Sequence, residues 1–328
     1  MRAHVYHTFG AAADVLRAED RPRPSPERGE VLVRLRTSGL NPHDTKRRSG
    51  WLGGAVRAGG QIPHSDGAGD IAGLGPDVTG RAIGQRVMVF GAGHGRIGGT
   101  AADYVSVPAQ FTIPLPATCS FEQAAALGVP AITAAHAVLS GGPVADRWVL
   151  IHGGLGAVGR AAVDIAVWSG ARVIATHGTP ARAGDLTALG AHHILDRHAC
   201  DIAAEVARIT GGHGADLIVD VDFGANVAID AACIAIGGRI AAYSATSNRT
   251  PVLPYYDFAL KGAVLQFVQA TLLSPEASRA AAAIVSARLA AGGLQPSIGH
   301  ALPLSEIAEG HSLLESGTAK GKIIFVLD

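Results

Sequence analysis

A glycine-rich segment at residues 149–166, VLIHGGLGAVGRAAVDIA, constrains the fold of this chain more than any other feature. Three of its glycines fill the spacing GxGxxG between an apolar run typical of a strand and an alanine-rich run typical of a helix. In this pattern the first glycine permits a tight turn, the second lets a pyrophosphate approach the backbone, and the third lets helix and strand pack closely. Backbone amides at the helix N-terminus favour the bound anion. The segment predicts a dinucleotide site, with a ligand-free turn as the alternative, and its predicted contacts are Gly154, Gly156, Ala157, Val158 and Gly159.

The chain on both sides of this segment alternates apolar runs with alanine-rich helical stretches. Such alternation predicts βαβ units around a doubly wound parallel sheet. The candidate strands are residues 148–152, 172–176, 193–195, 217–221, 239–243 and 264–268. We therefore expect a cofactor-binding domain over residues 121–269.

The first 120 residues have a different pattern, with short runs rich in Val and Ile separated by Gly, Pro and Asp. This spacing predicts antiparallel β-structure, either a sandwich or a barrel. The closing apolar run, residues 322–327, has no crossover helix behind it, so we expect the C-terminus to return to the first domain. The predicted first domain is thus residues 1–120 completed by residues 270–328.

Composition disfavours several classes of protein. The 328 residues carry 27 Lys plus Arg against 27 Asp plus Glu, without a basic block, so nucleic acid is not an expected partner. The longest apolar stretch, residues 124–139, is interrupted by Gly, Pro and His, and the chain does not open on a signal-peptide core, so no membrane association is expected. Cys119, Cys200 and Cys233 form no CxxC pair, which is typical of reduced thiols in a cytoplasmic protein.

The residues after the second candidate strand favour NADPH over NADH. A carboxylate there would accept the ribose 2′-hydroxyl and repel a 2′-phosphate, but none appears before Asp185. Threonines at this point can donate hydrogen bonds, and two arginines can supply the cationic fork that a phosphate prefers. The alternative is that both arginines are solvated surface residues. The predicted contacts are Thr176, His177, Arg182 and Arg197.

Several further segments occur in the order and spacing of a known family. They are SGLNPHDTKRRSG (38–50), IPHSDGAGDIAGLGPDVTG (62–80), VPAITAAHAV (129–138), VIATHGTPARAGDLTALGA (173–191), GGRIAAYSA (237–245) and HALPLSEIAEGHSLLESGTAKGKIIFVLD (300–328). Over essentially its whole length the chain resembles the zinc-independent quinone oxidoreductase (zeta-crystallin-like) family of the medium-chain dehydrogenase/reductase superfamily. The resemblance implies an α/β protein with a GroES-like β-barrel catalytic domain and a doubly wound Rossmann NADPH-binding domain. It also implies hydride transfer from NADPH to a quinone and assembly into a homodimer or homotetramer.

The resemblance also bears on zinc. The alcohol dehydrogenase branch has a cysteine where this chain has Asn41, a histidine where it has Ser65, and a further cysteine near Val129. The four-cysteine cluster of a structural zinc is absent as well, since residues 90–110 contain no cysteine. Without a thiolate or an HxxxH pair, we expect no metal. The remaining alternative is a regrouped histidine site formed by His43, His64 and His94.

Asn41, at the former metal position, is the predicted catalytic amide, donating to substrate or ribose; an Asx turn before Pro42 is the alternative. The resemblance places further residues at the nicotinamide end of the cofactor. For Thr133 the alternative is a helix-satisfying threonine, and for Lys322 it is a solvated lysine. These residues are Thr133, Tyr243, Ser244, Phe267, Val268 and Lys322.

Some choices stay open at this stage. Several family members carry a tyrosine where this chain has Lys46, so water or Lys46 is the expected proton source. The same scaffold reduces the activated double bond of enones, alkenals or enoyl thioesters, which needs the same hydride donor and the same hydrogen bonds to oxygen. A non-catalytic NADPH-binding protein is a further alternative.

Overall fold

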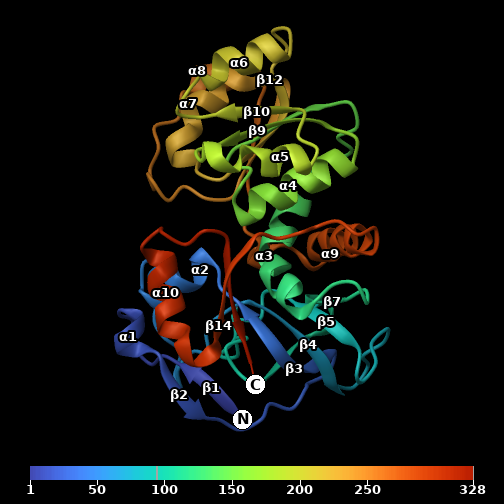
Figure 1. The fold of residues 1–328 in the computed structure, drawn as a ribbon, viewed down its shortest axis with the longest axis vertical. Helices are drawn as coiled ribbons and strands as arrows, with labels where there is room; N and C mark the ends of the chain where they lie inside the picture. The colour runs from blue at the N-terminus through green and yellow to red at the C-terminus, as the bar shows by residue number, and fades with distance from the viewer. Residues whose placement is uncertain (94, 328) are drawn as a thin grey trace. The chain divides into compact units, whose positions relative to one another are not determined.

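The computed structural model describes residues 1–93 and 95–327 and divides into two compact units (Figure 1). Unit 1 comprises Met1–Val129 and Leu289–Asp328, and unit 2 comprises Pro130–Arg288. An N-terminal unit completed by the C-terminal segment is the organisation expected from the sequence. The divisions, however, fall later in the chain than residues 120 and 270.

Helix α3 (Phe121–Leu139) explains the first difference, because the division falls within it. Gly128 has non-helical angles, φ −6° and ψ −109°, so the helix is kinked there. Ala125 and Ala126, before the kink, pack with Ile324 in unit 1. A composition change at residue 121 marks the start of this helix and not the change of unit. At the other end, most of α9 (Pro275–Ala290) belongs to unit 2.

Unit 1 is built on a seven-stranded sheet in which β14 and β15 are parallel and the other pairings are antiparallel. The strand order is β14-β15-β3-β4-β5-β7, with β6 also paired to β3, and β1 pairs separately with β2. The strands are β1 (Arg2–Val5), β2 (Arg17–Asp20), β3 (Glu30–Gly39), β4 (Asp66–Leu74), β5 (Arg86–Val89), β6 (Tyr104–Pro108), β7 (Thr112–Pro114), β14 (Ile298–Pro303) and β15 (Lys322–Val326).

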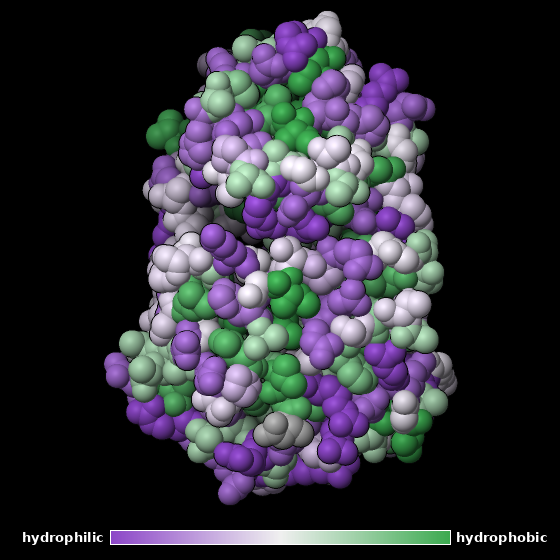
Figure 2. Space-filling view, viewed as in Figure 1, coloured by the Kyte–Doolittle hydropathy of each residue, from purple (hydrophilic) through white to green (hydrophobic). Residues whose placement is uncertain are grey.

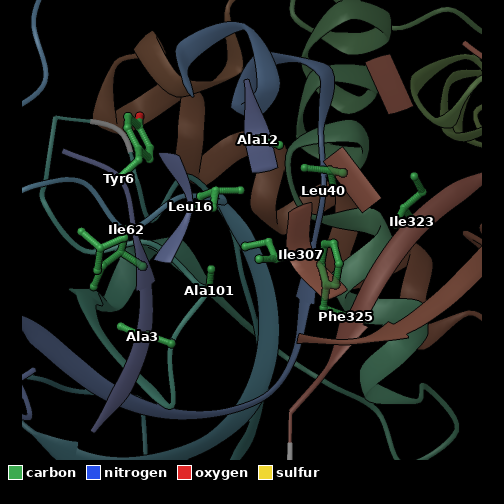
Figure 3. Packing of buried hydrophobic residues seen from close by; sticks show 12 residues of the cluster. Ala3, Tyr6, Ala12, Leu16, Leu40, Ile62, Ala101, Ile307, Ile323 and Phe325 are labelled. Atoms are coloured by element: carbon green, nitrogen blue, oxygen red, sulfur yellow. The ribbon is translucent and has the colours of Figure 1, made fainter. Parts of the chain in front are cut away.

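The C-terminal return is fixed by sheet pairing and by a shared core. Ile324 of β15 pairs with Gly39 of β3. Figure 3 shows Phe325 and Ile323 in the same cluster as Leu40 and the N-terminal Tyr6. Burying such apolar side chains contributes about 1.5–3 kcal/mol each, so the C-terminal segment is part of this unit's core. The helices of unit 1 are α1 (Ala12–Val15), α2 (Pro42–Arg48) and α10 (Ile307–Glu315).

Unit 2 contains a six-stranded sheet, entirely parallel, with the order β10-β9-β8-β11-β12-β13. The chain runs outward from β8 in one direction and then in the other, which is the doubly wound arrangement. All six strands expected from the sequence are present, as β8 (Trp148–Ile151), β9 (Arg172–His177), β10 (His193–Asp196), β11 (Ala215–Asp220), β12 (Ile234–Ala242) and β13 (Val264–Phe267).

The helices of unit 2 connect these strands, and α4 and α5 lie beside β9 and β10 (Figure 1). They are α4 (Ala157–Trp168), α5 (Ala183–Ala188), α6 (Ile202–Ile209), α7 (Phe223–Cys233) and α8 (Tyr255–Ala259). Short 3₁₀ turns, η1 to η4, occur at Ala109–Phe111, Pro180–Arg182, Ala270–Leu272 and Leu304–Glu306.

The surface mixes polar and apolar residues, as the face in Figure 2 shows. None of the helices in the described part of the chain is both long enough and apolar enough to cross a membrane.

Candidate functional site

The glycine-rich loop lies between β8 and α4, at the carboxyl ends of β8 and β9. Two of its amides are tied to Thr176, the residue before the last in β9. Gly153 N–H donates to Thr176 Oγ1 at 3.0 Å, and Gly154 N–H donates to the Thr176 carbonyl at 2.8 Å. Thr176, a predicted cofactor contact, is buried, and its two hydrogen bonds fix the position of the loop.

One of the tasks expected of the loop glycines, the tight turn, belongs to a different glycine from the one that the sequence predicted. The tight turn falls at Gly153, with φ +67°, and not at Gly154. A Cβ on Gly154 would lie 2.9 Å from Leu186 Cδ2, so this glycine serves packing. A Cβ on Gly159 would lie 2.2 Å from the Gly153 carbonyl oxygen, which is the close helix–strand contact expected of the third glycine.

Gly156 is the position where the loop is open. It is exposed, it is the N-cap residue of α4, and a Cβ there would meet only the Gly153 oxygen, at 3.4 Å. No side chain caps this helix end, so the first amides, at Ala157 and Val158, have no partner within the helix. The positive end of the helix dipole at this N-terminus favours an anion. These features fit a pyrophosphate.

His177, the last residue of β9, and Arg197, which follows β10, lie close to Gly178. His177 is buried, and its Nδ1 has no hydrogen-bond partner among the described residues. Arg197 N–H donates to the His177 carbonyl at 2.9 Å. A Cβ on Gly178 would lie 2.8 Å from Arg197 Nε, so the exposed guanidinium stands against the backbone after β9.

Arg182 is held in an ion-pair cluster. Its Nη2 lies 2.8 Å from Asp185 Oδ2, and Arg160 Nη1 lies 3.2 Å from the same oxygen. Burial lowers the pKa of Arg160, while the Asp185 carboxylate opposes that shift. The sequence reasoning missed Arg160, although a cation directly after the third motif glycine was a usable signal.

The residues predicted for the nicotinamide end that belong to unit 2 lie on three elements. Thr133 is buried in α3. Tyr243 N–H donates to the Asp220 carbonyl at 3.0 Å, and Val268 N–H donates to the Ala242 carbonyl at 2.8 Å, so the ends of β12 and β13 are adjacent. Burial, reinforced by the Asp220 charge, raises the pKa of Tyr243 well above its usual range.

Ser244 and Phe267, the remaining two of these predicted residues, lie beside Phe223. The Ser244 carbonyl accepts from Phe223 N–H at 2.9 Å, and its Oγ lies 2.9 Å from Thr246 Oγ1. Phe267 is 75% exposed on the edge strand, with its ring edge-on to Phe223 at 6.3 Å between centroids. Within unit 2, Phe267 therefore belongs to the edge of the sheet, whereas Val268 is buried.

In unit 1, Asn41 lies just before α2 and is buried, with 3% of its surface exposed. Its Nδ2 donates to Asp66 Oδ2 at 2.7 Å, and its Oδ1 accepts from Lys322 Nζ at 2.7 Å. Its backbone N–H donates to Asp44 Oδ2 at 2.9 Å, which helps to begin the helix. The amide is thus oriented by residues far away in the sequence.

Lys322 is buried, so it is not the solvated lysine that the sequence left open. Its Nζ donates to the Leu40 carbonyl at 2.6 Å as well as to Asn41 Oδ1. Burial lowers the pKa of Lys322, although the nearby Asp66 and Asp44 charges oppose this shift. The contacts within unit 1 direct this ammonium to Asn41.

Asp66 contacts Asn41 and Val129 and directly follows Ser65, the three places at or near which the alcohol dehydrogenase branch is expected to have its zinc ligands. Its Oδ1 accepts from Val129 N–H at 2.8 Å and its Oδ2 from Asn41, while the adjacent Ser65 Oγ lies 2.7 Å from His43 Nε2. Burial raises the pKa of Asp66 to about 6, opposed by the Lys322 charge. Sequence reasoning missed this carboxylate, although it directly follows Ser65.

These donors do not fit a zinc ion. Asn41 uses both ends of its amide in internal hydrogen bonds, and the side chain of Val129 has no atom that can bind a metal. In the described part of the chain no group of three or more His, Cys, Asp or Glu side chains is arranged to hold a metal. Of the alternative histidine set, His64 Nε2 lies 2.9 Å from His311 Nε2 and burial lowers its pKa to about 4, while His94 lies outside the described residues.

Two family models match the chain. "Alcohol dehydrogenase GroES-like domain" matches residues 27–117, and "Zinc-binding dehydrogenase" matches residues 157–286. Together with the mixed seven-stranded sheet of unit 1 and the doubly wound sheet of unit 2, these matches define a medium-chain dehydrogenase/reductase.

Relatives narrow this class. The quinone oxidoreductase of Lama guanicoe is 31% identical over 100% of this chain and 98% of its own length. The chain therefore belongs to the quinone oxidoreductase family. Among solved structures, an NAD-dependent alcohol dehydrogenase is 30% identical, with a TM-score of 0.87 and full coverage of both chains. A mycobacterial protein complexed with NADPH is 26% identical, with a TM-score of 0.84, covering 99% of this chain and 100% of its own.

Proposed function

We propose that this protein transfers a hydride from NADPH to a quinone without a metal ion. The observation that carries the proposal is the Asn41 amide, fixed by Asp66 and Lys322 at the position of a zinc ligand, in a chain that also has an open dinucleotide loop at Gly156. Full-length similarity to quinone oxidoreductases supports the same substrate class.

The chemistry suits such a site. When bound, NADPH supplies the hydride from its nicotinamide ring. A quinone accepts hydride readily, so the protein's tasks are to hold the two rings in contact, exclude water and donate hydrogen bonds to the oxygen that gains charge. Asn41 Nδ2 has one N–H bound to Asp66, and its second N–H is the proposed donor. Lys46, whose Nζ lies 4.7 Å from the centre of the Trp51 ring, or water supplies the proton.

Binding of NADPH in preference to NADH is part of the proposal. It is supported by the absence of a carboxylate in the last residues of β9 and by the Arg197 guanidinium against Gly178. Asp185 engages Arg182, so Arg197 is the better candidate for the 2′-phosphate contact. A charge-assisted contact of this kind contributes about 1.5–3 kcal/mol, which corresponds to roughly a 10- to 150-fold change in affinity.

The cofactor preference is tested by fluorescence titration of NADPH and NADH. Arg197→Ala is expected to weaken NADPH binding at least tenfold and to leave NADH binding unchanged, with a smaller effect for Arg182→Ala. Arg172→Ala is the matched control, because Arg172 begins β9 at the opposite end of the strand. Equal weakening of both dinucleotides by Arg197→Ala, or tighter binding of NADH by the wild type, would refute the NADPH preference.

The substrate class is tested by following the oxidation of NADPH by its absorbance with a quinone, an enone and an enoyl thioester, each with and without a chelator. Reduction of the quinone with the chelator harmless is the expected result. Reaction with only the enone or the thioester would show that the substrate is an activated double bond and not a quinone. Inhibition by the chelator would refute the metal-free site. Binding of NADPH without turnover of any acceptor would favour a non-catalytic role.

We also propose that the protein is a homodimer joined at the open edge of the unit 2 sheet. Strand β13 has free pairing groups on one side, and its neighbourhood exposes Val264 (55%), Phe267 (75%) and Leu260 (82%). Sedimentation analysis of the wild type and of Phe267→Asp tests this. A monomeric wild type, or a dimer that Phe267→Asp leaves intact, would contradict the proposed interface.

A further inference from the structure

We infer that Lys322 is a positioning residue for the Asn41 amide: its buried ammonium orients that amide and strengthens the N–H group that faces the substrate. This inference rests on the proposed function, because it assigns a task within the same site. It differs from the expectation that Lys322 binds the cofactor.

The contacts around Asn41 leave its amide one orientation. Lys322 Nζ has only donors, so the atom that lies 2.7 Å from it must be the amide oxygen. The carboxylate of Asp66 has only acceptors when ionised, so the atom at 2.7 Å from its Oδ2 must be the amide nitrogen. An amide flipped by half a turn would place its N–H donors against the Lys322 ammonium and its oxygen against the Asp66 carboxylate, and neither pair can form a hydrogen bond.

Both partners are held firmly. Lys322 is the first residue of β15, which pairs with β3, and its Nζ is also bound to the Leu40 carbonyl at 2.6 Å. Asp66 is the first residue of β4, and its other oxygen accepts from Val129 N–H at 2.8 Å. Lys322 and Asp66 are 7% and 0% exposed. Neither partner therefore exchanges readily with water.

The same arrangement polarises the amide. A cation at the carbonyl oxygen draws electron density from the nitrogen, and hydrogen bonds in series strengthen one another in a low-dielectric interior. The remaining N–H of Asn41 is consequently a better donor than the N–H of a solvated asparagine. A donor aimed at an oxygen that gains charge lowers the barrier to hydride transfer more than it aids binding of the ground state.

A Lys322→Met variant tests this directly, because methionine has a similar length and no charge. Loss of a directed donor costs about 10²–10³ in kcat. This variant keeps the Asn41 amide but makes it a weaker and less firmly oriented donor, so we expect kcat with the reacting quinone to fall roughly tenfold or more. The dissociation constant for NADPH is expected to stay within about twofold. Lys320→Met, an exposed lysine two residues earlier, is the matched control and is expected to behave as wild type.

A spectroscopic measurement on the wild type makes the test independent of how the variant folds. The chain has three asparagines, Asn41, Asn226 and Asn248, so ¹⁵N labelling of asparagine yields few side-chain amide signals. We expect the Asn41 amide protons to lie downfield of those of the exposed Asn248 and to exchange more slowly with water. In Lys322→Met they are expected to move toward the Asn248 position.

Three results would overturn the inference. Wild-type Asn41 signals that coincide with those of Asn248 would show that the amide is not polarised. A weaker NADPH affinity with unchanged kcat in Lys322→Met would make Lys322 a cofactor contact, and unchanged values of both would give it no part in the reaction. Failure of the proposed function is distinct, because it appears as a wild type that reduces no quinone whatever its amide spectrum.

Discussion

Replacing Gly159 with alanine tests the link between helix packing and the cofactor loop. The added Cβ would lie 2.2 Å from the Gly153 carbonyl oxygen, 2.9 Å from the Gly153 carbonyl carbon and 2.9 Å from Gly154 Cα. All three are backbone atoms, so no side chain can turn away to relieve the overlap. Either the first turn of α4 or the loop must move until the nearest contact approaches the usual 3.4 Å.

The size of the effect follows from this overlap. Overpacking of a well-filled site costs about 1–3 kcal/mol. For a unit of this size each kcal/mol corresponds to a decrease in Tm of about 2–4 °C. Because the same loop positions the amides for the pyrophosphate, we also expect NADPH affinity to fall tenfold or more, since misplacement by ~1 Å weakens directed contacts strongly.

Gly156→Ala provides the matched control. Its Cβ would meet only the Gly153 oxygen, at 3.4 Å, and its φ of −72° suits any residue. The Tm of the unliganded protein is therefore expected to change by less than that of Gly159→Ala. If a pyrophosphate contacts this backbone, the methyl group hinders it and NADPH affinity falls without loss of stability.

Thermal unfolding followed by circular dichroism, together with NADPH titration by fluorescence, measures both quantities on the two variants. The reasoning predicts that Gly159→Ala loses stability and affinity, whereas Gly156→Ala loses affinity only. A Gly159→Ala protein with the wild-type Tm and the wild-type NADPH affinity would refute it.

Two further predictions concern unit 2. Burial raises the pKa of Asp230 to about 7, so its contribution to stability is present below about pH 4, where the unfolded carboxyl is also protonated, and is lost as the pH rises through 7. In the wild type Asp230 Oδ1 lies 3.0 Å from His152 Nε2. The variant Asp230→Asn should therefore gain stability relative to wild type as the pH rises from 5 to 8, by at most about 1.4 kcal/mol per pH unit. A difference in unfolding free energy between variant and wild type that is the same at pH 5 and pH 8, measured by urea unfolding, would contradict this. Asp201 caps α6 by accepting from Ala203 N–H and Ala204 N–H, so Asp201→Ala should cost about 1 kcal/mol in urea unfolding, and no measurable loss would contradict the capping role.

The sequence alone determined the architecture of unit 2 and much of unit 1. Alternation of apolar and alanine-rich runs predicted all six strands of the parallel sheet, because each βαβ unit has a local periodicity. The glycine spacing predicted the loop between β8 and α4 for the same reason. The tight turn at Gly153 and the kink at Gly128 were not predicted, since φ and ψ at a glycine depend on what packs against it.

The tertiary structure decided the surroundings of Asn41. Its position next to Pro42 permitted a local turn, and the structure does place Asn41 in the capping box of α2. Its other side-chain partners, Asp66 and Lys322, lie 25 and 281 residues away. Nothing in the periodicity of the sequence indicates that the first residues of β4 and β15 both contact Asn41. That arrangement depends on β15 pairing with β3, which brings the C-terminal segment into the first unit.

Local pattern thus predicted which segments form strands, helices and the cofactor loop, because hydrogen bonding and side-chain burial within such segments repeat with a short period. Long-range pairing decided which buried charges face one another. A lysine read from sequence is most often solvated, but sheet pairing buries Lys322 and leaves the Leu40 carbonyl and the Asn41 amide as its partners. The oriented amide that we propose for catalysis is therefore a property of the fold.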